Sequence, residues 1–144
     1  MKKSLLALAL LPGLALLSGC AAPADEAEPI AIFHTEVGQC LNPDQDQTAA
    51  FIVPCDQPHL FEVTAVHPIE VADYPGDETI QTLVDETCPD AFFDYTGQAA
   101  AASTEWGSVA FAPRGSDWEE QDQRNIVCAV TSLDGEPASG SAKE

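Results

Sequence analysis

The chain has 144 residues, of which 24 are acidic and only five are Lys or Arg, so its formal net charge at pH 7 is −19. Such an acidic surface repels nucleic-acid phosphates and anionic lipid headgroups, and the sequence has no basic patch that would offset this repulsion. Nucleic-acid binding is therefore excluded. The length suffices for one domain with a hydrophobic core but not for two.

The N-terminal segment has the pattern of a secretory signal. Two lysines precede an apolar run over residues 5–17, which is shorter than the roughly 20 residues of a membrane-spanning helix. The run ends in "LSGC" at 17–20, which resembles a bacterial lipobox, in which the cysteine receives a diacylglycerol and becomes the mature N-terminus. We expect residues 1–19 to be cleaved and Cys20 to hold the protein at the outer face of the cell membrane. The alternative is an ordinary signal with a chance cysteine.

Composition divides the mature chain into three parts. Loss of residues 1–19 from 144 leaves 125 residues with 24 acids and three bases, a charge of −21. Residues 20–32 are mostly Ala, Pro and acids, which is typical of a linker. Residues 134–144, "DGEPASGSAKE", are small and polar and are expected to be a disordered tail. The folded domain is expected over 33–133.

Four cysteines remain after the signal: Cys40, Cys55, Cys88 and Cys128. An even number in an exported chain indicates two disulfides, for which three connectivities exist. No pair has C-x-x-C spacing, so the cysteines indicate neither a zinc knuckle nor a thioredoxin-type motif. They are expected to be structural crosslinks.

Two segments before the middle of the chain have the composition of strands, residues 48–53 and 60–66. The second segment alternates, with Phe61, Val63 and Ala65 predicted on one face. Two more strands are predicted over 108–112 and 125–133.

A helix is predicted from near Asp77, where acids in the first turn suit the helix dipole, and Pro89 is expected to kink it or to begin a new helix. Cys88 falls on its apolar stripe, and Cys128 shares a strand face with Ile126 and Val130. Both sulfurs should enter one core, which favours the pairs Cys88–Cys128 and Cys40–Cys55. The predicted fold is a small α+β domain, with an antiparallel sheet of four to five strands packed by one helix and two disulfides.

Five groups of residues form a recognisable set: "VGQCLN" at 37–42, "VPCDQPHLFEVTAV" at 53–66, "YPGDETI" at 74–80, Cys88 with Phe92, Tyr95 and Gly97, and Trp118 with "DQRNIVC" at 122–128. Together they resemble the septum formation domain family of actinobacterial envelope proteins. Where relatives tend to carry W-x-x-G-D-R, this chain reads "WEEQDQR". The resemblance implies a link to cell division but no biochemical activity.

His59 is the most suggestive candidate for a binding or catalytic site, because Asp56 and Glu62 flank it. A catalytic or metal role needs a second group that converges on the ring. His67 lies eight residues further along, about 26 Å away on a continuous strand, so one site cannot use both histidines directly. The alternative is a histidine tied into a turn.

Aromatic residues are candidates for a recognition surface or, alternatively, for the core: Tyr95, Trp106, Phe111 and Trp118. The alternating residues Asn42, Asp44 and Asp46 resemble the start of a calcium loop. However, Gln47 stands where Gly is needed and Val53 where Glu must chelate. No metal or cofactor is therefore expected.

The sequence favours a membrane-anchored cell-surface lipoprotein with a non-catalytic interaction domain. Its expected partners are the membrane, through the lipid on Cys20, and an envelope protein or cell-wall component. No catalytic motif of a known class is present in the sequence. Two alternatives stay open: a cell-wall-acting enzyme that uses His59 with an acid, and a surface lipoprotein that binds a small ligand or a metal.

Overall fold

The structure is a computed structural model that describes residues 28–144. The expected signal peptide, Cys20 and most of the expected linker lie outside the described residues. The elements in chain order are β1 (Ile30–Ala31), the 3-10 helix η1 (Ile32–His34), β2 (Cys40–Pro43), β3 (Ala49–Val53), β4 (Phe61–Pro68), α1 (Asp77–Thr96), the 3-10 helix η2 (Ala100–Ala102), β5 (Trp106–Phe111), α2 (Gly115–Gln121) and β6 (Asn125–Ser132).

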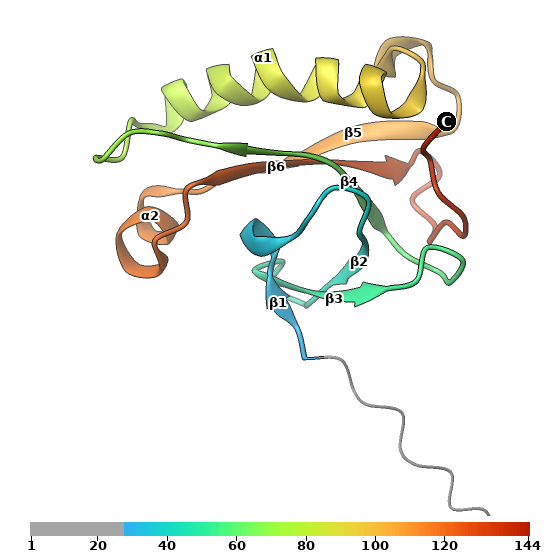
Figure 1. Cartoon of the computed structure of the whole chain (residues 1–144), viewed down its shortest axis with the longest axis horizontal. Helices are drawn as coiled ribbons and strands as arrows, with labels where there is room; N and C mark the ends of the chain where they lie inside the picture. Colours follow the sequence, from blue (N-terminus) through green and yellow to red (C-terminus); the bar gives the residue numbers. More distant parts are fainter. Residues whose placement is uncertain (1–27) are drawn as a thin grey trace, which may run out of the picture.

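All six strands form one antiparallel sheet in the order β1-β3-β2-β4-β6-β5. Figure 1 shows α1 lying along one side of β4, β6 and β5, while β1, β2 and β3 curl round on the other side. The α+β class is confirmed. No helix in residues 28–144 has both the length and the apolar composition needed to cross a membrane.

The predicted count of four to five strands and one α-helix was too low, since the described chain has six strands and two α-helices. The missed elements are short: β1 has two residues, β2 has four and α2 has seven. Elements of this length show too little of a repeat for apolar periodicity to reveal them. The expected linker, residues 20–32, also overlaps the fold, because β1 lies within it and Ile32 is buried.

Strand β6 is the centre of the core because it is buried on both faces. Ile126 and Cys128 belong to the cluster that faces α1, whereas Val127 belongs to the cluster on the side of the β2–β3 hairpin. Successive residues of a strand point to opposite faces of the sheet, so consecutive apolar residues here supply two separate cores.

Both predicted disulfide pairs are confirmed. Cys88–Cys128 joins α1 to β6, and Cys40–Cys55 joins β2 to the turn after β3. Residue 89 does not begin a new helix, as had been one expectation, because α1 runs through Pro89 to Thr96. Cys88 and Phe92, on either side of the proline, are both buried, so packing and the crosslink hold the helix across it.

The predicted alternation of β4 was wrong in one place. Phe61 and Val63 pack with the hairpin-side cluster, but Ala65 packs with the cluster that faces α1. A register shift between Val63 and Ala65 makes Thr64 an extra residue in the strand. Such a β-bulge exchanges the two faces of a strand, and composition alone does not reveal its position.

The two disulfides should differ in their contribution to stability. Cys88 and Cys128 are 40 residues apart and Cys40 and Cys55 are 15 apart. Crosslinks of these spans lower the conformational entropy of the unfolded chain and so raise the free energy of unfolding by about 4 and about 3 kcal/mol, respectively. We predict that chemical denaturation gives a larger loss of unfolding free energy for C88S/C128S than for C40S/C55S. The reverse order would contradict this account.

Candidate functional site

The carboxylate of Glu62 is buried and accepts three hydrogen bonds from within the described chain. Glu62 is 1% exposed on β4. Its Oε1 accepts a hydrogen bond of 2.6 Å from the Tyr95 hydroxyl and another from the Ser141 hydroxyl, and its Oε2 accepts one of 2.7 Å from the Ala142 backbone N–H. Three donors replace the water that a buried carboxylate loses.

The segment that was expected to be a disordered tail supplies two of these three donors, so that expectation differs from the structure. Ala138 forms an antiparallel bridge with His59, Gly140 N–H donates to the Cys55 carbonyl at 2.6 Å, and Ala142 is buried. The segment is therefore docked on the domain, although most of its side chains are exposed.

Tyr95 joins this site to α1, near the C-terminal end of the helix. Its pKa is raised to about 12, first by burial and then by the hydrogen bond and the charge of Glu62. The pKa of Tyr74, the other tyrosine, is also raised to about 12, chiefly by its hydrogen bond to Asp77. Both hydroxyls therefore keep their protons well above the usual range and act as donors.

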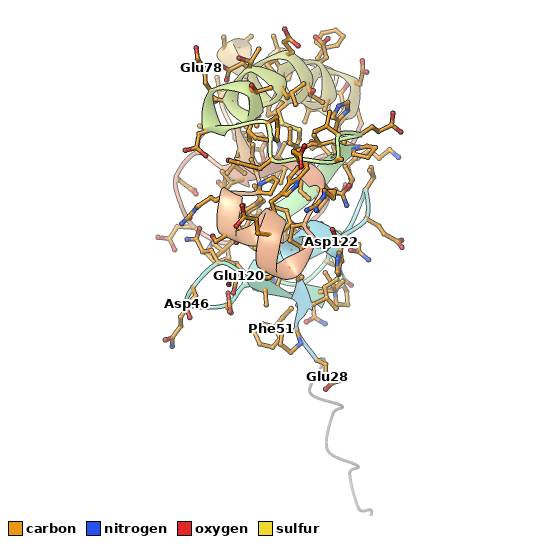
Figure 2. The ribbon with its side chains drawn as sticks, turned by 90° about the vertical axis from the view of Figure 1, so that its left-hand side faces the viewer. Glu28, Asp46, Phe51, Glu78, Glu120 and Asp122 are labelled. Atoms are coloured by element: carbon orange, nitrogen blue, oxygen red, sulfur yellow. A yellow bond between two sulfur atoms is a disulfide. The ribbon has the colours of Figure 1, made fainter. Side chains whose placement is uncertain are left out.

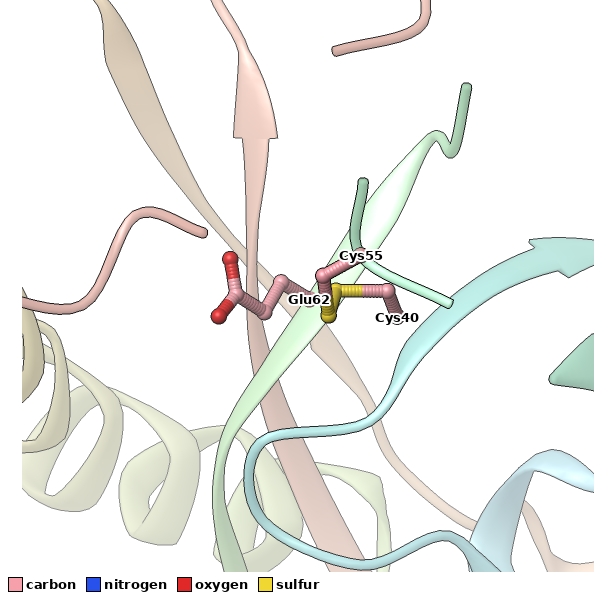
Figure 3. A group of neighbouring side chains, drawn as sticks. All are labelled: Cys40, Cys55 and Glu62. Carbon is pink, nitrogen blue, oxygen red and sulfur yellow. A yellow bond between two sulfur atoms is a disulfide. The ribbon is translucent and has the colours of Figure 1, made fainter. Parts of the chain in front are cut away.

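The site does not offer metal ligands, although Cys40, Cys55 and Glu62 lie within 4.8 Å of one another. Figure 3 shows the carboxylate beside the disulfide. A metal requires cysteine as thiolate, and both sulfurs are already bonded to each other. This group is the only one of its kind in residues 28–144.

His59 is tied into the structure and does not meet either acid that flanks it in the sequence. The ring is 1% exposed, and its Nδ1 lies 2.9 Å from the Gln57 carbonyl. A carbonyl only accepts, so this contact places the proton on Nδ1 and leaves Nε2 buried without a partner. No hydrogen bond within the described chain joins His59 to Asp56 or Glu62, and Asp56 is exposed.

Trp118 is a core residue, 3% exposed on α2. Its ring N–H donates to the Ala72 carbonyl at 3.3 Å, and the Arg124 guanidinium lies 3.9 Å above the ring. Arg124 also pairs with Asp122 at 2.8 Å. Asp122 ends α2 in the left-handed conformation, within the "WEEQDQR" segment that departs from the W-x-x-G-D-R pattern.

Two of the open hollows on the described surface combine apolar and polar side chains. One, of about 350 Å³, is lined by aromatic residues that include Phe61 and Phe111 and by charged residues that include Arg114 and Asp117. The other, of about 490 Å³, runs beside α1 and is lined by Glu86, Asp90 and Asp94. Acidic side chains lie on the outside of several elements, as the labelled Glu78, Glu120 and Asp122 do in Figure 2.

We predict that the tail contributes to stability through Ser141. The S141A variant removes one donor from a buried carboxylate and should lower the unfolding free energy by about 1.5–3 kcal/mol. Ser139 is exposed in the same segment, so S139A is the matched control and should change stability by less than about 0.5 kcal/mol. Equal, small effects of both changes in a denaturant titration would show that the tail is not docked.

The raised pKa values predict how stability depends on pH. A tyrosine whose pKa is higher in the folded chain stabilises the protonated state, so its contribution is complete below about pH 10 and is lost as the pH rises toward 12. The ultraviolet absorbance of tyrosinate should therefore rise near pH 12 in the folded protein. In the Y95F variant only the transition of Tyr74 should remain. Ionisation of either tyrosine near pH 10 in the folded, unchanged protein would contradict the assigned contacts.

The comparisons with known proteins identify the family. The sequence pattern of the family described as Septum formation matches residues 37–143, which includes the docked tail up to Lys143. No curated protein and no solved structure matches the chain at a significant level. The match spans most of the chain and confirms the resemblance found in its motifs: the chain belongs to the Septum formation family.

Proposed function

We propose that the protein is a membrane-anchored cell-surface lipoprotein whose domain acts by non-catalytic interaction with an envelope protein or cell-wall component. Membership of the Septum formation family suggests a role in cell division or in the envelope. The "LSGC" pattern at 17–20 supports lipidation of Cys20, and the excess of acids over bases supports interaction through charge.

The proposal that the domain is non-catalytic rests on the burial of its two candidate reactive side chains, Glu62 and His59. Glu62 accepts from three donors inside the fold, and the Nδ1 of His59 is held by a backbone carbonyl. Catalysis needs a base or nucleophile within reach of a substrate, and both groups are about 1% exposed. Two open hollows on the described surface instead combine aromatic side chains with charged ones, a mixture that suits recognition.

Crosslinking in native membranes tests the interaction role. Because residues 28–144 contain only one Lys, an amine-reactive reagent has too few sites on the domain, so the full chain is expressed with a photo-crosslinking residue in place of exposed Phe93 or Phe51. The species captured after illumination are identified by mass spectrometry. We expect a specific envelope partner. Capture of none, together with turnover of a wall substrate, would reject the proposal.

The anchor has a separate test. Because an acyl chain on Cys20 supplies the membrane affinity, the C20A variant should appear in the medium or stay unprocessed, while the unchanged protein stays with the membrane. Mass analysis of the mature N-terminus should show a lipidated cysteine. An N-terminus without fatty acid, in a protein that remains membrane-bound, would contradict this part of the proposal.

A further inference from the structure

Helix α1 has an unusual charge distribution. It contains six acidic residues and no basic residue: Asp77, Glu78, Asp85, Glu86, Asp90 and Asp94. Glu86, Asp90 and Asp94 are spaced by four residues and so lie in a row along one face. Asp94 is in the last turn, where the helix dipole disfavours an acid. Nothing in local helix physics explains this row.

The row faces a groove. All three acids line the hollow of about 490 Å³, together with residues of β4, of the turn before β2 and of the docked tail. Each carboxylate is exposed, and none has an ion pair within 4.0 Å among the described residues. The groove therefore carries three carboxylates without an ion pair, and Thr64 and Ala65 of β4 form part of its lining.

A second, independent feature of the groove is an unpartnered hydroxyl. Thr64 lines it, is only 7% exposed, and its Oγ1 has no hydrogen-bond partner. Thr64 is also the extra residue of the β4 bulge, and bulges commonly re-aim a side chain at a functional site. An unpartnered hydroxyl oxygen is an acceptor that a segment bound in the groove can use.

The chain itself shows that this groove accepts a cation. The ammonium of Lys143, at the end of the docked tail, lies 5.7 Å from the centroid of the Tyr95 ring, and both residues line the groove. An ammonium over an aromatic face is attracted by the electron density of the ring. The groove thus combines acids, an aromatic face and a free acceptor.

The spacing of the acids decides what kind of cation fits. Successive members of the row are about 6 Å apart along the helix axis, since each residue rises 1.5 Å. Calcium needs its oxygen ligands about 2.3–2.6 Å from one centre, and these three acids do not form a group of ligand atoms within 4.8 Å of one another. Alternate side chains of an extended peptide are about 6.6 Å apart, which matches the row.

We propose that the groove formed by Glu86, Asp90, Asp94, Thr64 and Tyr95 binds an extended peptide segment of a partner protein that carries Lys or Arg at alternate positions. This inference rests on the proposed interaction role and names its surface and the chemistry of the partner. The basic side chains pair with the row of acids, and Thr64 accepts a hydrogen bond from the segment.

Calorimetric titration of the full chain in neutral detergent at low salt tests the proposal. The probe is acetylated and amidated Lys-Ser-Lys-Ser-Lys, and the composition control is Lys-Lys-Lys-Ser-Ser. The E86Q/D90N/D94N variant should bind the probe about tenfold more weakly. The E78Q/E119Q/E120Q variant loses the same charge at exposed positions outside the groove and should bind within about twofold of the unchanged protein.

The T64V change separates a binding role from a structural one. It removes the unpartnered hydroxyl and keeps the shape of the side chain, so the melting temperature should stay the same or rise. Affinity for the alternating peptide should nevertheless fall by about threefold. An unchanged affinity would show that Thr64 does not contact the segment and would remove the second support for this site.

Three outcomes would overturn the proposal: no binding of the probe, equal weakening by the two triple variants, or equal affinity for the two peptides. Failure of this inference is distinguishable from failure of the interaction role. If E86Q/D90N/D94N still captures the same partner in native membranes, the role stands and the groove is not its surface. If the probe binds but no membrane partner is captured, the groove is still a peptide-binding surface and the proposed interaction role is rejected.

Discussion

The hydrogen bonds to the carboxylate of Glu62 are the interaction on which the rest of the fold depends. Glu62 belongs to β4, Tyr95 to α1, and Ser141 and Ala142 to the tail, so one buried group joins three separate parts of the chain. Burial of a carboxylate costs free energy unless its oxygens accept hydrogen bonds, so the loss of one donor weakens the whole arrangement. The tail must dock for the sheet and helix to keep an acid in their interior.

The disulfide between α1 and β6 allows the helix to carry its charge. Like charges four residues apart destabilise a helix by about 0.2–0.5 kcal/mol per pair, and α1 has two such pairs in the row from Glu86 to Asp94. The Cys88–Cys128 crosslink contributes about 4 kcal/mol, which outweighs that repulsion several times. The disulfide and the apolar packing on the inner face of α1 therefore stabilise the helix enough for its outer face to carry several acids.

Much of this structure could be predicted from residue patterns, and the failures have identifiable causes. The disulfide pairing followed from the apolar stripe that includes Cys88 and from the strand face of Cys128. The repeat of apolar residues shows which face of a helix or strand is buried, and both cysteines lie on such a face. Residues 134–144 were expected to be disordered because their composition is small and polar. Their order comes from a partner 80 residues away, Glu62, and no local pattern encodes such a contact.

The candidate site shows the same limit. His59, Asp56 and Glu62 are neighbours in the sequence, but the structure buries the first and third and exposes Asp56. The groove beside α1 was missed because it depends on a bulge at Thr64 and on the docked Lys143, both of which are tertiary features. The spacing of Glu86, Asp90 and Asp94 was visible, yet with 24 acids in the chain it could not be separated from chance.

Hydrogen exchange at the backbone amide of Ala142 tests the central claim most directly. That N–H donates to Glu62 in the interior, whereas Ser139, three residues earlier, is exposed. The account predicts that the Ala142 amide is protected to a degree comparable with the amides of β6, while Ser139 exchanges rapidly. Exchange of Ala142 as fast as that of Ser139 would contradict the claim that a buried carboxylate holds the tail, the helix and the sheet together.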